Sequence, residues 1–83
     1  MRNFSNIAKL VKEKRKLVGL SQSVLSGILG YKNAQFISNM ERGVCSVPLQ
    51  KVKALIGALK CDEKEVLEAV VEDVRATFKM YTR

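Results

Sequence analysis

The chain has 83 residues, of which 47% are hydrophobic, and it carries a net charge of +7. A chain of this length buries one modest core, so we expect a single domain, 1–83, and not two. Residues 1–43 hold eight Lys and Arg against two acids, whereas residues 44–83 hold seven against six. This positive first half favours an acidic partner, with nucleic acid ahead of a membrane surface; the alternative is a basic protein without such a partner.

Several classes of protein are disfavoured by what the sequence lacks. No apolar run approaches a membrane span, and charges break the N-terminal stretch too often for a secretory signal, so we expect a cytoplasmic protein. There is no histidine, and Cys45 and Cys61 have no close second pair, so we expect no metal and no cofactor. A phosphate-binding glycine loop and an isolated carboxylate pair are also missing, which disfavours an enzyme and a small-molecule substrate.

Five helical segments follow from the spacing of the apolar residues, and no stretch alternates as a strand would, so we expect an all-α fold. The first segment, about residues 6–18, carries an apolar stripe and stops at Gly19, a good C-cap residue. This stripe consists of Ile7, Leu10, Val11, Leu17 and Val18. The second segment begins at Ser21, which suits an N-cap, and runs to Leu29.

The third segment starts after Asn33, which can cap it, and ends at Gly43. About four residues, 30–33, join it to the second segment, which is the geometry of a helix-turn-helix. Pro48 suits the first turn of the fourth helix. The predicted buried face of the fourth helix consists of Leu49, Val52, Leu55, Ile56 and Leu59.

The third segment has two different faces. Ile37, Met40 and Glu41 cluster on one side at helical spacing, and a row of polar residues faces away. This polar row consists of Gln35, Ser38, Asn39 and Arg42. A face meant only for water is better filled by Lys, Glu, Gln and Arg than by Ser and Asn, which are weaker helix formers, whereas amides and hydroxyls suit base edges in the DNA major groove. The polar row therefore favours DNA readout over the alternative of an ordinary solvated face.

Arg15 lies at the edge of the apolar stripe of the first helix, so its guanidinium group needs an anion. The first half holds two acids. Glu13 lies on another side of the same helix, whereas Glu41 lies on the inward face of the third helix. We expect an Arg15–Glu41 ion pair that clamps the two helices together; the alternative is that both side chains reach water separately.

The stretches GLSQSVLSGILG and QFISNMERG resemble the Cro/C1-type, or XRE, family of helix-turn-helix DNA-binding domains. The resemblance covers about residues 6–70 and leaves a C-terminal helix extension at about 71–83. It implies a five-helix, lambda-repressor-like fold with the helix-turn-helix in helices 2 and 3. It also implies sequence-specific binding of double-stranded DNA by a small regulator or repressor, bacterial or phage-encoded and nucleoid-associated when bound.

The resemblance assigns roles to residues whose positions match. The third helix, about 33–42, reads the major groove. Base contacts are Asn33, Ala34, Gln35, Ser38 and Asn39, Gln22 matches a phosphate contact, and Arg15 and Glu41 match the buried ion pair of the family. Beside Gln22 we also expect phosphate contacts from Ser21, Lys32 and Arg42. The turn at residues 31–34 is one residue longer than in the best-known repressors, so either Asn33 or Gln35 is the first base reader.

Two aromatic positions near the turn stay open. Phe36 either belongs to the core or touches a thymine methyl group in the groove. Tyr31 and Lys32 either follow the phosphate backbone or form an exposed turn.

The last helix starts at a capping-box-like pair, Asp62 and Glu65, and its helical pattern continues past the resemblance. Its apolar residues are spaced by four and three, as in a coiled-coil seam: Leu67, Val71, Val74, Phe78 and Tyr81. This seam either folds back on the first helix, against Phe4 and Ile7, or pairs with a copy of itself across a two-fold axis, which we favour.

A symmetric homodimer would bind a near-palindromic operator, with its third helices about 34 Å apart. A different class of function remains as the alternative. In it the chain is a protein-interaction module, such as an antitoxin or an adaptor, that acts mainly through its last helix.

Overall fold

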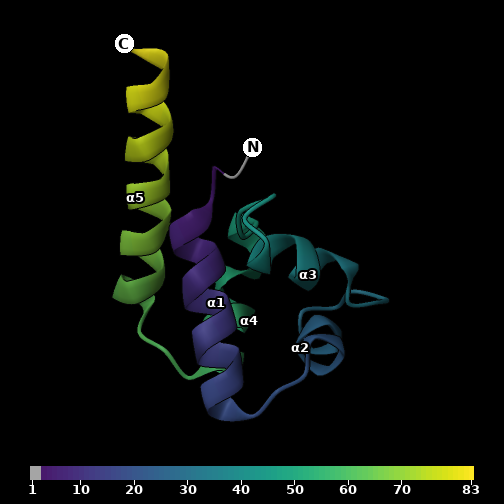
Figure 1. Ribbon diagram of the computed structural model, residues 1–83. Coiled ribbons are helices and arrows are strands. Elements are labelled where there is room, and N and C mark those ends of the chain that lie inside the picture. Colours follow the sequence, from purple (N-terminus) through teal and green to yellow (C-terminus); the bar gives the residue numbers. More distant parts are fainter. Residues whose placement is uncertain (1–2) are drawn as a thin grey trace.

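The computed structural model describes residues 3–83 as helices joined by short turns (Figure 1). In chain order the elements are α1 (Ser5–Val18), α2 (Gln22–Ile28), α3 (Gln35–Glu41), the 3-10 turn η1 (Leu49–Lys51), α4 (Val52–Leu59) and α5 (Glu63–Tyr81). No strand occurs between residues 3 and 83, so the predicted all-α fold with five α-helices is confirmed. None of these helices is both long enough and apolar enough to pass through a membrane.

α1 lies between the other helices, with α5 alongside it and α2 and α3 across its other side (Figure 1). It packs against α3, α4 and α5. The molecule is elongated, with extents of 41 × 24 × 22 Å, and the C-terminal part of α5 continues past the other helices. The long last helix is therefore covered by α1 along only part of its length.

Gly19, Ser21 and Asp62 cap their helices as predicted, whereas the N-cap position of α3 is occupied by Ala34 and not by the predicted Asn33. Gly19 ends α1 in the left-handed conformation, with φ of 77°, which a glycine adopts without steric cost. The Ser21 hydroxyl accepts a hydrogen bond from the Val24 N–H at 3.1 Å, as an N-cap does. At the start of α5, the Asp62 N–H donates to the Glu65 carboxylate at 3.0 Å, which confirms the capping box.

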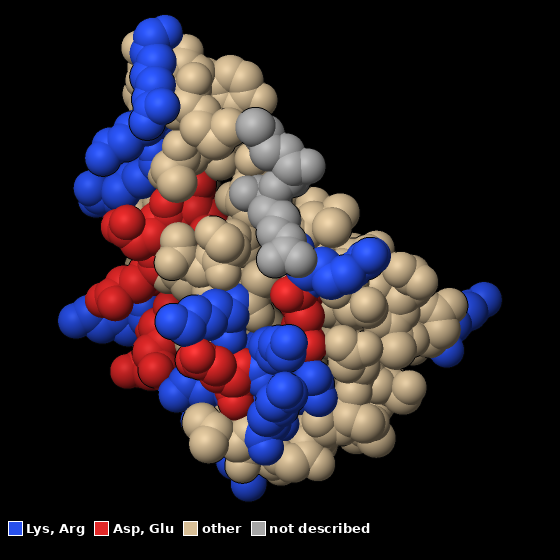
Figure 2. Space-filling view, viewed as in Figure 1, with Lys and Arg blue, Asp and Glu red and all other residues tan. Residues whose placement is uncertain are grey.

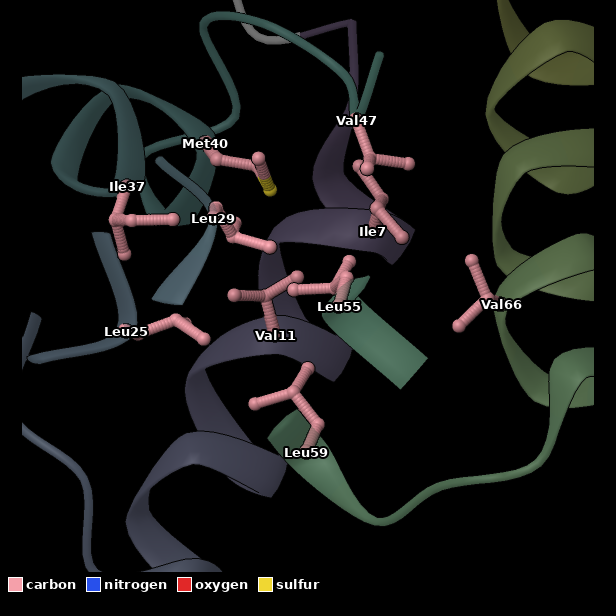
Figure 3. Packing of buried hydrophobic residues seen from close by; sticks show 10 residues of the cluster. All are labelled: Ile7, Val11, Leu25, Leu29, Ile37, Met40, Val47, Leu55, Leu59 and Val66. Carbon is pink, nitrogen blue, oxygen red and sulfur yellow. The ribbon is translucent and has the colours of Figure 1, made fainter. Parts of the chain in front are cut away.

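One cluster of apolar side chains joins all five helices (Figure 3). Its members are Ile7, Val11, Leu25, Leu29, Ile37, Met40, Val47, Leu55, Leu59 and Val66. Ile37 and Met40 come from α3 and are fully buried, as the sequence predicted. Burial of these two side chains fixes which face of α3 points outward.

Two predicted core residues are exposed. Leu17 is 78% exposed because the last turn of α1 runs past the start of α5, where Lys14 forms an ion pair with Glu65 at 3.1 Å. Leu49 is 83% exposed because it lies in η1, whose tighter turn takes it out of phase with the buried residues of α4.

Candidate nucleic-acid interface

Arg15 and Glu41 form a bidentate ion pair between α1 and α3. The Arg15 Nε lies 2.5 Å from Glu41 Oε2, and Arg15 Nη2 donates to Glu41 Oε1 at 3.0 Å. The two side chains are only 12% and 5% exposed. The Arg15 Nη1 group also donates to the Leu20 carbonyl at 2.9 Å, so the guanidinium group ties the α1–α2 connection to the same point.

The charges of this pair stabilise each other. Burial by itself would raise the pKa of Glu41, but hydrogen bonds from Arg15 and Gln22 and the nearby positive charge outweigh it, so the pKa lies below its ordinary value. The hydrogen bond to Glu41 raises the pKa of Arg15. Both groups are therefore ionised at neutral pH, and the pair is a charged clamp.

Gln22 connects α2 to the same carboxylate. Its Nε2 group donates to Glu41 Oε1 at 3.1 Å, so Glu41 in α3 holds side chains from both α1 and α2. Gln22 is half-buried, whereas the neighbouring Ser21 is exposed at the N-terminus of α2. The two helices of the helix-turn-helix are thus joined to each other and to α1 by one polar cluster of Arg15, Gln22 and Glu41, which we call the Glu41 clamp.

On the outer face of α3, three of the four residues of the polar row are linked by hydrogen bonds. Gln35 Nε2 donates to Asn39 Oδ1 at 3.0 Å, and Arg42 Nη2 donates to the same oxygen. Gln35 and Arg42 are exposed, while Ser38 and Asn39 are half-buried. The row presents an amide oxygen from Gln35 as an acceptor and amide and guanidinium N–H groups as donors, which is the chemistry of base edges.

The N-terminal end of α3 is built by Asn33 and Ala34. The Asn33 Oδ1 atom accepts a hydrogen bond from the Gln35 N–H at 2.9 Å and so satisfies a free donor of the first turn. Ala34 occupies the N-cap position, and Gln35 is the first residue of the helix. Asn33 and Gln35 therefore lie next to each other at the end of α3 that begins the polar row.

The turn before α3 is braced by two aromatic rings. Tyr31 and Phe36 stack with their ring centroids 4.7 Å apart, and Phe36 is half-buried against the core. This packing favours the core role of Phe36. The Lys51 ammonium group lies 5.3 Å from the centre of the Tyr31 ring, so it adds a positive charge beside the exposed Lys32. Lys51 was not predicted at this place, because it comes from η1, which is distant in the sequence.

Asp73 holds α5 against the start of α1, a role that the sequence analysis missed. Its carboxylate accepts hydrogen bonds from the Asn6 N–H at 2.8 Å, the Asn6 side-chain amide at 3.0 Å and the Ile7 N–H at 3.0 Å. It is 2% exposed. Phe4 occupies the N-cap position of α1, and its side chain makes no capping hydrogen bond. The carboxylate of Asp73 in α5 therefore caps α1 instead. In the sequence, Asp73 continues the four- and three-residue spacing of Val66 and Val70, and this pattern could have indicated that Asp73 lies on the buried face of α5.

The predicted seam of α5 is exposed along its whole length. The exposed fractions are 59% for Leu67, 37% for Val71, 60% for Val74, 67% for Phe78 and 78% for Tyr81. α5 packs on α1 through another face, which carries Val66 and Asp73. Phe4 lies beside the C-terminal part of the seam, in a shallow hollow that Val74, Phe78 and Tyr81 also line. The seam as a whole therefore does not fold back on α1.

Comparison with known families identifies the class of protein. A family model described as Helix-turn-helix matches residues 11–66. The chain belongs to this family, of the XRE type that its motifs resemble, and it is a DNA-binding transcription regulator. The matched range includes the Glu41 clamp and the polar row but ends before the seam.

A solved structure shares the fold. The chain is similar to the crystal structure of the wild-type restriction-modification controller protein C.Esp1396I, with a TM-score of 0.65 and 16% sequence identity. The similarity covers 89% of this chain and 94% of that chain. A comparison with curated proteins gives no match.

Proposed function

We propose that this regulator reads a specific DNA sequence by placing α3 in the major groove. The observation that carries the proposal is the polar row on the exposed face of α3, which the Glu41 clamp holds against α1 and α2. A rigidly held helix loses little side-chain and backbone freedom on binding. The proposed base contacts are Asn33, Ala34, Gln35, Ser38 and Asn39.

The phosphate contacts in this proposal flank α3 on both sides. Ser21, Gln22, Lys32 and Arg42 are the proposed residues. Ser21 and Gln22 lie at the N-terminus of α2, Lys32 lies in the turn, and Arg42 follows the last residue of α3. Since Gln22 also donates to Glu41, its contact with a phosphate would couple the position of the DNA backbone to the clamp.

We further propose that one domain, formed by the whole chain, binds as a symmetric dimer through the α5 seam and acts as a repressor in the cytoplasm. The seam supports this because an exposed apolar stripe of this length needs a partner. Two copies would place two α3 helices on a near-palindromic operator, about one DNA turn apart. A bound dimer would block access to a promoter, and this action requires binding and no catalysis.

The first experiment selects DNA fragments from a random duplex pool with the full chain. We expect an enriched half-site that occurs twice with two-fold symmetry. Binding to it should weaken by orders of magnitude between about 50 and 200 mM salt if roughly six or more phosphates are contacted. A pool without an enriched sequence, or a flat salt response, would contradict the proposal.

The second experiment tests the assigned register of α3. Gln35→Ala and Asn39→Ala should each cost about 1 to 3 kcal/mol against the selected site and relax base preference. Lys32→Ala is the matched control, because loss of a phosphate contact should weaken binding evenly across sequences. An unchanged preference in Gln35→Ala would show that the assigned register is wrong.

A second candidate function is a protein-interaction module that acts through α5. The exposed seam favours it, because the same stripe can bind another protein's helix. The two functions differ in which variants matter. Seam variants would abolish a module's function while the polar-row variants leave it intact.

A further inference from the structure

α5 has a strongly uneven charge distribution. Residues 62–73 contain six acids and one lysine, whereas residues 74–83 contain three basic residues and no acid. Figure 2 shows basic side chains at the C-terminal end of this helix and acidic ones below them along it. The helix therefore has an acidic half that packs beside α1 and a basic half that extends beyond it.

Charges of opposite sign lie along the same flank of the seam. At helical spacing, Glu68 and Glu72 in the acidic half and Arg75 and Lys79 in the basic half follow one side of α5. All four residues are exposed. Within the chain, Arg75 lies 3.6 Å from Glu72, but both side chains are more than 60% exposed, so this contact holds them weakly.

The seam itself is nearly symmetric about Val74. Leu67 and Tyr81 are equally distant from Val74 along the helix, and Val71 and Phe78 lie between them on either side. An antiparallel pair of helices with a two-fold axis at Val74 brings Tyr81 against Leu67 and Phe78 against Val71, twice. Every apolar residue of the seam then meets an apolar partner.

From these features we infer that α5 binds α5 of a second copy in an antiparallel orientation. The inference rests on the proposed dimer and specifies how its two chains meet. In antiparallel helices the same flanks face each other, so Lys79 meets Glu68 and Arg75 meets Glu72 of the second copy. A parallel pair would instead place the two acidic halves side by side and the two basic halves side by side, which costs free energy.

The surface near the start of α5 has room for the other end of the partner helix. A groove of about 240 Å³ lies between the η1–α4 segment and α5, and its apolar residues are Leu49, Val52, Val66, Leu67 and Val70. In the antiparallel register, Tyr81 of the second copy reaches the Leu67 end of this groove. Burial of Leu49 under that ring gives a reason for the high exposure of Leu49 in the single chain.

Disulfide cross-linking distinguishes the orientations. Glu68→Cys and Lys79→Cys are made separately in the full chain, with Cys45 and Cys61 replaced by alanine. We expect an equimolar mixture to form several-fold more cross-linked dimer than either variant alone. Efficient cross-linking of each variant with itself would overturn the antiparallel inference.

DNA binding is measured on the same samples, so that failure of the antiparallel inference can be distinguished from failure of the proposed function. A parallel dimer that binds the selected operator would overturn the inference and leave the proposed function intact. A monomer by sedimentation, with no cross-link in any sample, would overturn the inference and the dimer together. Loss of specific DNA binding in a well-formed antiparallel dimer would overturn the proposed function alone.

Charge reversal provides an independent test with a matched control. Glu68→Lys with Glu72→Lys should weaken self-association by about tenfold or more, because basic flanks then face each other. Adding Arg75→Glu and Lys79→Glu restores the net charge and the antiparallel complementarity, so association should return. Failure of the four-residue exchange to restore association, in a chain with unchanged helix content, would contradict the inference.

Discussion

At the scale of single residues, Glu41 is the most consequential acid of residues 1–43. Its carboxylate binds Arg15 and Gln22 at once, so removal of Glu41 leaves a guanidinium group that is only 12% exposed without its anion. A buried charge without a partner is costly, whereas the loss of a solvated acid is not. The stability of the helix-turn-helix should therefore depend on this side chain.

We expect Glu41→Ala to lower the free energy of unfolding by about 3 to 5 kcal/mol. Glu13→Ala, an exposed acid on α1, is the control and should change it by less than about 0.5 kcal/mol. Urea denaturation measures both. A loss below about 1 kcal/mol for Glu41→Ala would mean that the clamp contributes little to stability.

The depressed pKa of Glu41 also predicts a pH dependence. A carboxyl group whose pKa is lower in the folded state stabilises the fold above its unfolded pKa, and this contribution is lost as the pH falls through the folded pKa. Urea denaturation between pH 7 and 3 should therefore show a stability that begins to fall as the pH enters the ordinary range of glutamate pKa values and keeps falling towards the lower pKa of folded Glu41. Glu41→Gln should reduce the slope, and an unchanged slope would contradict the assignment.

At the scale of elements, Asp73 decides how α5 lies on α1. Its carboxylate satisfies two backbone N–H groups at the N-terminus of α1, where a negative charge is also favoured by the helix dipole. Asp73→Ala leaves these buried donors without an acceptor, so we expect a loss of about 1 to 3 kcal/mol. Chemical denaturation tests this.

Ala76→Ser serves as the control for this variant, because Ala76 is exposed on another face of α5. Hydrogen exchange at Asn6 and Ile7 adds a local readout, and we expect faster exchange at both positions in Asp73→Ala. Equal stability of the two variants would show that α5 is held by its apolar contacts alone.

Features that depend only on residues close together in the chain could be predicted from the sequence. Helix ends at Gly19, Ser21 and Asp62 follow from local chemistry, and the inward face of α3 follows from spacing. Asp73 and Lys51 were not predictable in the same way. Each acts on an element far away in the chain, and such contacts depend on how the helices pack.

The Arg15–Glu41 pair lies between these two cases. Its partners are also far apart in sequence, but the first half of the chain offered few acids and only one on an inward face. Because only one acid of the first half lay on an inward face, the partner of Arg15 could be inferred from the sequence. The exposure of Leu49 was missed because periodicity does not reveal a change from α-helical to 3-10 geometry.

At the scale of the whole molecule, the proposed dimer depends on the exposed seam. Val74→Glu would place two carboxylates together near the two-fold axis, so we expect a folded monomer with much weaker binding to a duplex with two half-sites. Ala76→Glu, an exposed position away from the seam, is the control of equal charge. Sedimentation and titration of one- and two-half-site duplexes measure the effect.

A shortened chain provides a second form of this test. It has to keep Asp73, so a chain that ends at Arg75 is suitable, whereas one that ends at Glu72 would also uncap α1. If the full chain is monomeric at tens of micromolar and remains so on DNA, the seam does not mediate a dimer.

The bond between Asp73 and the start of α1 also affects how the protein is made. Asn6 and Asp73 are 67 positions apart, so α1, which leaves the ribosome first, stays uncapped until most of the chain has been synthesised. The contacts between α1 and α3 join positions much closer in sequence and form earlier, because closing a shorter loop costs less entropy. We therefore expect the contacts between α1 and α3 to form before α5 closes the fold.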